Sequence, residues 1–510
     1  MHDMNTTSKQ FVLRSNDAQE EAPEVMKVAA RPIRAVLIQP PIHQGVKSLL
    51  PQVDDEGGEG IGYKPPLGIL YCAAALREFT PHEVLVIDAI ASRLSLDEVV
   101  RRVKEFNPEV VGVSAWTDFW YPAYRTGQLI KEALPNVHLT YGGPHLGIYP
   151  AETLAFPFVD SVVVGDGEIP FMYLCNMVAN KAMDNSMRGL HLKPYGVKSS
   201  PDTFYIHGDL DELPIPERTL LPVEAYSSVL GKDSLVTTMI TSRGCPNRCT
   251  FCKLNFQKTL ARSASNVIEE FHRIHKLGIR EVEIYDDTFT WSKKRLIEIC
   301  EGLIAANLGV KFAVRDRVSS ASVDLEILRL LKRAGCTRIH YGIESGEQRI
   351  LDRMKKNITT EQARKAVRLA KKSGMTVLTY FMFGNLDETK KDMQKTIDFA
   401  LELDANFAQF SITIPCAGTE MYKEALQTGI ISTDYWSSYA TNPVPDFMPP
   451  QLIENLVDRT TLMAMRNQAV RRFYFRPKFI VKELLKLRSP AEFVKKARMG
   501  MQLAQSVFSR

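Results

Sequence analysis

The sequence predicts an α/β protein with a doubly wound parallel sheet, followed by a partial (β/α)6 barrel and a C-terminal helical tail. Two observations support this fold class. Short apolar runs alternate with helical patterns along most of the chain, which is typical of parallel strands joined by crossover helices. The 510 residues are 45% hydrophobic and 24% charged, a composition that provides core for two or three globular domains and excludes a disordered or fibrous chain.

The first sheet is expected in residues 34–184. Residues 1–33 are polar and lack periodicity, so we expect a flexible leader there and no secretory signal. Five short apolar runs are the predicted strands, at 34–38, 83–87, 110–114, 137–143 and 159–165. Helical patterns separate them, at 66–79, 95–106, 121–134 and 151–156. Ligands of such sheets bind at the carboxyl ends of the strands.

A linker is predicted over residues 185–232, and a second alternating series occupies residues 233–430. Its predicted strands are 235–242, 281–287, 310–315, 338–345, 376–384 and 407–415. Its predicted helices are 265–277, 292–306, 323–335, 359–373 and 388–403. Six βα units in tandem favour a partial barrel over a second open sheet. Barrel chemistry lies at the carboxyl ends of the strands.

The C-terminal region, residues 431–510, is expected to be helical and basic. Helices are predicted at 451–474, 477–487 and 490–507. Residues 451–510 hold 13 Lys and Arg against 4 Asp and Glu, whereas the rest of the chain is slightly acidic, so no nucleic-acid partner is expected. Basic residues that alternate with Phe, Leu and Ile suit an amphipathic helix on an anionic membrane. They equally suit a helical subdomain packed on the barrel.

Three of the eight cysteines stand within eight residues, in the segment GCPNRCTFC (244–252). Cys245, Cys249 and Cys252 follow the first predicted strand of the second series. Thiolates are ligands for iron–sulfur clusters, zinc and copper(I). A structural zinc site needs four ligands, and the next histidine, His272, lies on a predicted helix, so a zinc site would need a distant residue. The other five cysteines are expected to be buried thiols in a reducing compartment.

This cysteine pattern resembles that of the radical S-adenosylmethionine (AdoMet, SAM) superfamily. Cys245, Cys249 and Cys252 match the three ligands of its 4Fe–4S cluster, and Phe251 stands at its aromatic position. The resemblance implies that AdoMet chelates the open iron and is cleaved to a 5′-deoxyadenosyl radical. It also implies a low-potential electron donor such as flavodoxin or ferredoxin.

Later segments agree with this resemblance. EIYDDTF (283–289) stands where the family has its second-strand motif, with an Asp pair in place of Gly-Gly-Glu. HYGIESG (340–346) matches the fourth-strand motif. The resemblance thus implies AdoMet contacts from Phe251, Asp286, Asp287, Arg315, Glu344 and Ser345. FMFGNLDET (381–389) and IPCAGTEMY (414–422) resemble two further family turns, and each could also be a strand-to-helix connection with a capping Thr.

The first domain resembles the cobalamin-binding domain that precedes the barrel in many radical AdoMet enzymes. Its loops GGPH (142–145) and GDGE (165–168) follow predicted strands, whereas no Rossmann GxGxxG is present. The expected cobalamin contacts are Ser114, Gly142, Gly143, His145, Gly165, Gly167 and Glu168. We expect the glycines to admit the flat macrocycle. Ile90 stands where some cobalamin domains carry a lower axial His. His145 is a weaker ligand candidate and more often a packing residue.

The resemblance implies a cobalamin-dependent radical AdoMet enzyme that methylates an unactivated carbon of a small, lipidic or tetrapyrrole metabolite through methylcobalamin. One alternative is an oxidative cyclase of the anaerobic magnesium-protoporphyrin monomethyl ester type. An alternative of another class is a non-enzymatic corrinoid sensor. A tRNA methylthiotransferase is disfavoured, because the sequence has no second cysteine trio. We expect a cytoplasmic protein, with peripheral contact to the inner membrane face through its basic tail.

Overall fold

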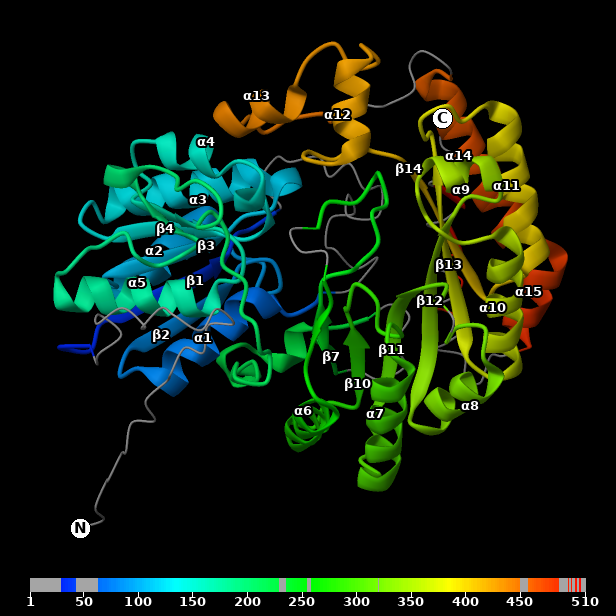
Figure 1. The fold of residues 1–510 in the computed structure, drawn as a ribbon, viewed down its shortest axis with the longest axis horizontal. Coiled ribbons are helices and arrows are strands. Elements are labelled where there is room, and N and C mark those ends of the chain that lie inside the picture. Colours follow the sequence, from blue (N-terminus) through cyan, green and yellow to red (C-terminus); the bar gives the residue numbers. More distant parts are fainter. Residues whose placement is uncertain are drawn as a thin grey trace.

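A computed structural model describes residues 29–42, 63–228, 235–254, 258–319, 321–449 and 457–485, and six residues between 494 and 505. Two six-stranded sheets lie side by side in the molecule (Figure 1). The second sheet is entirely parallel, and the first is parallel except for one antiparallel edge strand. The predicted α/β class with two successive parallel units is therefore confirmed.

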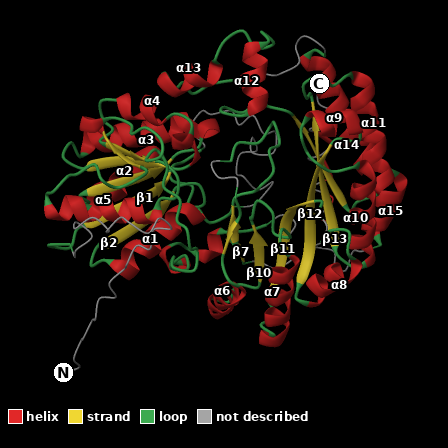
Figure 2. Cartoon of the chain, in the orientation of Figure 1, coloured by secondary structure: helices red, strands yellow, loops and turns green. Residues whose placement is uncertain are grey.

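The first sheet has the strand order β2-β1-β3-β4-β5-β6. Its strands are β1 (Arg34–Gln39), β2 (Glu83–Asp88), β3 (Val110–Ser114), β4 (His138–Gly142), β5 (Ser161–Val163) and β6 (Leu190–Leu192). Helices α1 (Leu67–Phe79) and α5 (Glu168–Asn180) pack together on one face, and α2 (Leu96–Phe106) and α3 (Trp120–Ala133) pack together on the other (Figure 2). Each face therefore has its own apolar core, as a doubly wound sheet requires.

The second sheet is a half-barrel with the order β14-β13-β12-β11-β10-β7. Its strands are β7 (Val236–Met239), β10 (Glu281–Ile284), β11 (Lys311–Arg317), β12 (Cys336–Glu344), β13 (Thr376–Phe383) and β14 (Phe407–Ile412). Its crossover helices are α6 (Ala264–Lys276), α7 (Lys293–Ala306), α8 (Leu325–Arg333), α9 (Gln348–Arg353), α10 (Thr360–Lys372) and α11 (Lys390–Leu403). They cover the convex side (Figure 1). Among the described strands, β7 and β14 do not pair, so the barrel stays open.

Alternation along the barrel strands separates an apolar face from a polar face. Side chains such as Val282, Phe312 and Ile339 belong to the core beneath the helices. Their neighbours Glu283 and Arg338 lie on the concave face, because successive strand residues point to opposite sides. The concave side of the barrel is therefore lined by charged and polar groups.

Several elements were not expected from the sequence. Strand β6 falls within the predicted linker and pairs antiparallel with β5. Helix α5 follows GDGE, and eleven of its thirteen residues are buried, so it shows little of the periodicity that marks a surface helix. A two-stranded ribbon of β8 (Ser242–Arg243) and β9 (Leu260–Ala261) flanks the cysteine segment. In the tail, α14 is Arg459–Tyr474 and α15 is Pro477–Leu484, and most of the predicted helix 490–507 lies outside the described residues.

The chain returns from the barrel to the first domain through α12 (Glu420–Gln427) and α13 (Tyr435–Thr441), which lie above both sheets (Figure 1). The buried indole N–H of Trp120 donates to the Ala440 carbonyl at 3.2 Å. The Tyr121 amide donates to the Tyr439 hydroxyl at 2.9 Å. These contacts join the start of α3 to the end of α13, so the two domains are tied on the side that also carries the strand ends of the first sheet.

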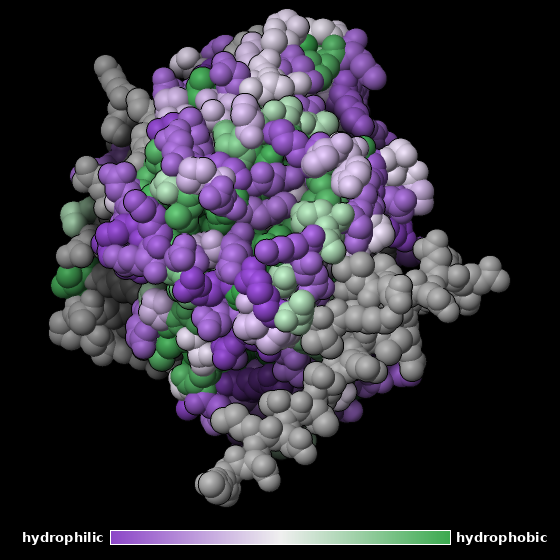
Figure 3. All heavy atoms as spheres, turned by 90° about the vertical axis from the view of Figure 1, so that its left-hand side faces the viewer, coloured by the Kyte–Doolittle hydropathy of each residue, from purple (hydrophilic) through white to green (hydrophobic). Residues whose placement is uncertain are grey.

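The face of the first domain in Figure 3 is largely hydrophilic, with hydrophobic residues scattered between the hydrophilic ones. No helix in the described part of the chain is long and apolar enough to cross a membrane.

Trp120→Ala should lower the free energy of unfolding by roughly 3–5 kcal/mol, because it removes a fully buried indole and leaves a cavity between α3 and α13. Trp116→Ala is the matched control, since Trp116 is 50% exposed, and it should change stability by about 0.5 kcal/mol or less. Urea unfolding of both variants checks this. Equal losses in the two variants would contradict the junction described above.

Candidate functional site

The three clustered cysteines lie on one loop between β8 and β9. Cys245 is buried, Cys249 is half-buried and Cys252 is exposed, and all three are free thiols. The Cys252 amide donates to the Cys249 carbonyl at 3.1 Å. Backbone hydrogen bonds anchor Thr250 to Met354 at the end of α9 and to Met421 in α12. The loop is thus held from both sides of the barrel mouth.

The surroundings of these thiols combine burial with positive charge. Burial raises the pKa of the half-buried Cys249, although the nearby cations Lys356 and Arg317 act in the opposite direction. Three free thiols on one loop are suitable donors for an iron–sulfur cluster. In the described chain, no three His, Cys, Asp or Glu side chains are yet held at metal-binding distances.

The two aspartates after β10 have different environments. Asp286 is buried, and its carboxylate accepts hydrogen bonds from the Thr241 amide at 2.6 Å and from the Ser242 hydroxyl at 2.8 Å. Asp287 is exposed and accepts from the Gly244 amide at 2.8 Å. Burial raises the pKa of Asp286. Asp286 therefore links the end of β10 to the segment after β7 through hydrogen bonds. The Asp287 side chain faces solvent beside the cysteine loop.

Glu344 and Lys356 form a buried ion pair next to that loop. Glu344 ends β12 with a φ of +76°, a left-handed conformation that is uncommon for a non-glycine residue. The Lys356 ammonium lies 2.7 Å from a Glu344 carboxylate oxygen and 5.5 Å from the centre of the Phe251 ring. The structure thus brings Phe251 and Glu344 together. Lys356 was not expected, because the segment MKKN carries no motif.

Ser345 does not lie with this group, contrary to the sequence expectation. Its side chain is fully buried. The hydroxyl shares a 3.1 Å hydrogen bond with the Thr396 hydroxyl and accepts from the Glu347 amide at 3.2 Å. These bonds join the end of β12 to α11, so Ser345 packs beneath the strand end.

Arg315 lies on the concave face of β11, beside His340 of β12. Its guanidinium stacks over the Tyr285 ring at 4.0 Å. Glu344 ends β12 four residues after His340, so Arg315 sits deeper in the barrel than the Glu344–Lys356 pair.

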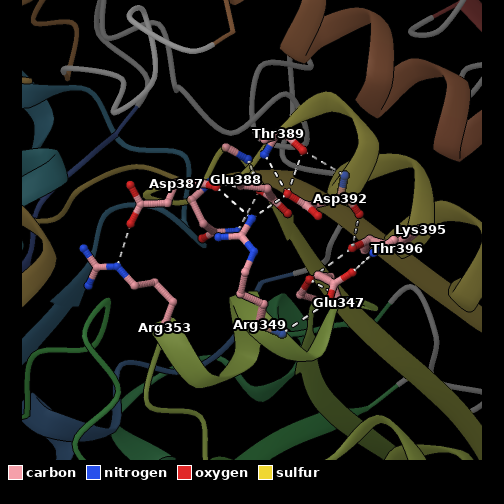
Figure 4. Close-up of polar contacts among 12 residues, drawn as sticks. Glu347, Arg349, Arg353, Asp387, Glu388, Thr389, Asp392, Lys395 and Thr396 are labelled. Atoms are coloured by element: carbon pink, nitrogen blue, oxygen red, sulfur yellow. Dashed lines mark hydrogen bonds and ion pairs between the residues drawn. The ribbon is translucent and has the colours of Figure 1, made fainter.

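The GNLDET turn, which resembled a family motif, is held by its own hydrogen bonds (Figure 4). The buried Glu388 carboxylate accepts from the Gly384 amide at 2.7 Å and from the Asn385 amide at 2.9 Å. Thr389 caps α11 in a capping box with Asp392. These contacts make the turn a strand-to-helix connection, which was the second interpretation of the sequence.

Three of the glycines after the strand ends of the first sheet lie against other parts of the protein rather than open space. A Cβ on Gly143 would lie 2.8 Å from the Ala115 carbonyl oxygen, and a Cβ on Gly165 would lie 2.1 Å from the Tyr205 carbonyl oxygen. A Cβ on Gly167 would meet the Cys72 sulfur at 3.0 Å. Chain packing therefore accounts for these three glycines. Gly142 and Ser114 are paired neighbours at the ends of β4 and β3 and are only partly buried.

His145 is fully buried in the core of the first domain. Its ring stacks on Trp120 with the ring centres 4.2 Å apart, and its Nδ1 lies 3.3 Å from the Thr117 hydroxyl. Burial lowers the pKa of His145 to about 3. The imidazole is a neutral core group, as the packing interpretation of this residue expects.

Glu168, in contrast, joins the two domains. One guanidinium nitrogen of Arg243 lies 2.6 Å from a Glu168 carboxylate oxygen, and another lies 3.0 Å from Asp166. The guanidinium also lies 5.1 Å from the centre of the Tyr71 ring. Arg243 stands two residues before Cys245 and was not singled out in the sequence, because a single arginine in a strand carries no pattern. Its contacts connect the cysteine loop to the strand ends of the first sheet.

Arg243→Gln should lower the free energy of unfolding by roughly 2–5 kcal/mol, because it leaves two carboxylates without their cation. The triple variant Arg243→Gln, Asp166→Asn, Glu168→Gln should be more stable than Arg243→Gln alone, because it no longer contains the two unpaired carboxylates. Urea unfolding of the single, double and triple variants measures the coupling. If the losses in unfolding free energy simply add across the variants, Arg243 and the two carboxylates do not stabilise one another.

Glu388→Gln should change the pH dependence of stability. Burial raises the pKa of Glu388 from 4.5 to about 7, so the folded chain binds this proton more tightly than the unfolded chain. The stability from this group is complete below pH 4.5 and is lost as the pH rises through about 7. Relative to the variant, wild type should therefore lose stability over this window, on the order of 3 kcal/mol. Glu361→Gln, at an exposed carboxylate, is the control for melting curves against pH.

Comparison with known proteins agrees with this architecture. The Radical SAM superfamily model matches residues 239–400, and the B12 binding domain model matches residues 61–174. An uncharacterized methyltransferase of Pyrococcus horikoshii is 33% identical over 459 residues, 89% of this chain and 95% of the relative. The anaerobic magnesium-protoporphyrin IX monomethyl ester cyclase of Rubrivivax gelatinosus is 28% identical, over 88% of this chain and 78% of the relative.

Among solved structures, the cobalamin-dependent S-adenosylmethionine radical enzyme OxsB with aqua-cobalamin and S-adenosylmethionine bound superposes with a TM-score of 0.70. The match covers 94% of this chain and 72% of OxsB at 18% identity, which establishes a shared fold. The two family models confirm the expected cofactors, which are a 4Fe–4S cluster, S-adenosylmethionine and cobalamin. The chain belongs to the family of cobalamin-dependent radical SAM enzymes.

Proposed function

We propose that this enzyme methylates an unactivated carbon of a small metabolite, with Cys245, Cys249 and Cys252 as the cluster ligands. When bound, a reduced cluster with AdoMet supplies a radical for hydrogen abstraction, and a corrinoid supplies the methyl group. The protein's task is to hold the substrate between the two. A low-potential donor such as flavodoxin or ferredoxin would supply the electron.

The observation that carries the proposal is the contact of Arg243 with Asp166 and Glu168. It places the loop with the three cysteines against the strand ends of the B12 binding domain. Radical generation and methyl supply would thus occur at facing surfaces of one molecule, which methyl transfer between the two sites requires. The 33% identical methyltransferase supports the same reaction class.

Within this proposal, AdoMet lies beside the cysteine loop. Asp287 offers an exposed carboxylate to its ammonium group, and Glu344 lies next to Phe251 of the loop through their shared contact with Lys356. Asp286 and Ser345 support the strand ends from within the core. Ser114, Gly142 and the loop from Gly165 to Glu168 form the part of the first domain that would face the corrin.

A second candidate function is oxidative ring formation, which the 28% identical cyclase supports over most of its length. Its named substrate is a magnesium-protoporphyrin monomethyl ester, so tetrapyrroles belong among the tested substrates. Lipids belong there as well. Helix α15 exposes Ile480, Val481 and Leu484 in a basic segment, which supports peripheral contact with an anionic membrane.

Product mass separates the two reactions. Reconstituted, reduced protein is incubated with methyl-labelled AdoMet and with lipid and tetrapyrrole extracts. We expect a product heavier than its substrate by one labelled methyl in place of hydrogen. Loss of hydrogen without label would favour the cyclase. Cys252→Ser should abolish AdoMet cleavage and product together, whereas Cys416→Ser, at an exposed cysteine on a different loop, should retain both. AdoMet that stays intact in wild type would overturn the radical reaction.

A further inference from the structure

The concave face of the barrel carries a polar layer around Arg315, a residue that the sequence assigned to AdoMet but that lies deeper in the barrel than the Glu344–Lys356 pair. Strand register places Arg315 beside His340 and Gly342 beside Tyr380. Tyr285 follows β10 directly and stacks under Arg315. Arg315, Tyr285 and Tyr380 are only partly buried, whereas His340 is buried behind them. The layer therefore presents one guanidinium and two phenols towards the open side of the half-barrel.

The carboxylates of this face are already engaged by cations. Arg338 lies 2.9 Å from Glu281 and 2.9 Å from Glu283. Lys64, which precedes α1 of the first domain, lies 3.7 Å from Glu283. With Arg315 included, three cations meet two carboxylates among the described residues of this layer. One positive charge is thus in excess, and Arg315 is the cation that makes no carboxylate contact among the described residues.

The hydrogen bonds of His340 fix the direction of the Tyr380 hydroxyl. The Arg338 Nε–H donates to His340 Nε2 at 3.3 Å, so this nitrogen acts as an acceptor. Burial and Arg338 lower the pKa of His340 to about 3, so the ring is neutral near pH 7. Its remaining proton must be on Nδ1, which therefore donates to the Tyr380 oxygen at 2.9 Å. The proton of Tyr380 is then left to donate elsewhere.

Arg315 also has an N–H group that is not used in hydrogen bonds among the described residues. One terminal nitrogen donates a hydrogen bond to the Tyr285 oxygen at 2.8 Å, and the Tyr285 hydroxyl donates a hydrogen bond to a Glu283 carboxylate oxygen at 3.2 Å. The Nε of Arg315 is buried without a hydrogen-bond partner among the described residues. A buried unpaired donor costs free energy unless a ligand satisfies it. The layer thus offers the Arg315 and Tyr380 donors.

We propose that this layer binds an oxyanion group of the substrate, a carboxylate or a phosphate, through Arg315 and Tyr380. A planar guanidinium suits either group, and the excess positive charge favours an anion over a neutral carbonyl. The inference rests on the proposed function, because it assigns this face to the substrate. It adds the substrate class, which is an anionic metabolite anchored below the radical source.

Binding of inorganic phosphate and of acetate to the cluster- and cobalamin-loaded protein tests the proposal without turnover. Phosphorus NMR line widths report phosphate, and displacement by acetate reports carboxylate. Wild type should bind at least one of the two anions. Arg315→Gln should abolish binding, and Tyr380→Phe should weaken it about tenfold, as expected for one lost hydrogen bond to a charged group. The anion that binds more tightly indicates whether the substrate carries a phosphate or a carboxylate.

Arg364→Gln is the matched control, because Arg364 also stacks on an aromatic ring, Phe399 at 4.9 Å, but belongs to α10. It should bind the anions like wild type. If Tyr380→Phe bound the anions as tightly as wild type does, the proposal would be overturned, even if Arg315→Gln failed to fold. Competition between AdoMet and phosphate would also overturn it, by assigning the donors to AdoMet. Anion binding without AdoMet cleavage would instead count against the proposed reaction alone.

Discussion

Arg243 is the last residue of β8, two residues before Cys245. Its guanidinium forms ion pairs with Asp166 and Glu168 of the other domain. The contact is possible only because parallel strands in both domains direct their carboxyl ends toward the same region. A guanidinium can serve two carboxylates at once, so one side chain fixes two loops. Burial raises the pKa of Asp166, and Arg243 favours its charged form. The position of the cysteine loop against the first domain therefore depends on the ion pairs of Arg243 with Asp166 and Glu168.

The alternation of strand residues explains how one sheet provides both a core and a reaction surface. In β12, Ile339, Tyr341 and Ile343 are buried in the apolar cluster with the outer helices. Arg338 and Glu344, at alternate positions of the same strand, form ion pairs on the concave side. A slip of one residue in register would exchange the two faces. Chemistry and stability are therefore coupled through the register of single strands.

The sequence predicted the order of strands and helices well, because each has a local period and parallel crossovers allow few topologies. It also located the cysteine loop, since three soft ligands at fixed spacing have few other uses. It did not anticipate the contacts that other residues make with distant segments of the chain. Gly143 and Gly165 resemble ligand loops in sequence but are required by neighbouring backbone. Ser345 and Asp286 stand at strand ends, yet their side chains turn into the core. Arg243 and Lys356 acquire their partners only in the folded chain.

Gly342 separates the two levels of the concave face. It lies on β12 between His340 and Glu344, on the same side of the sheet. A Cβ at this position would come within 2.6 Å of a Glu344 carboxylate oxygen and 3.2 Å of the Lys356 ammonium. The missing side chain therefore lets the Glu344–Lys356 pair fold over the strand end, next to Phe251 and the cysteine loop. Below it, Arg315 and Tyr380 keep their unpaired donors. The neutral pair at the upper level leaves the excess positive charge at the lower level, which favours an anion there.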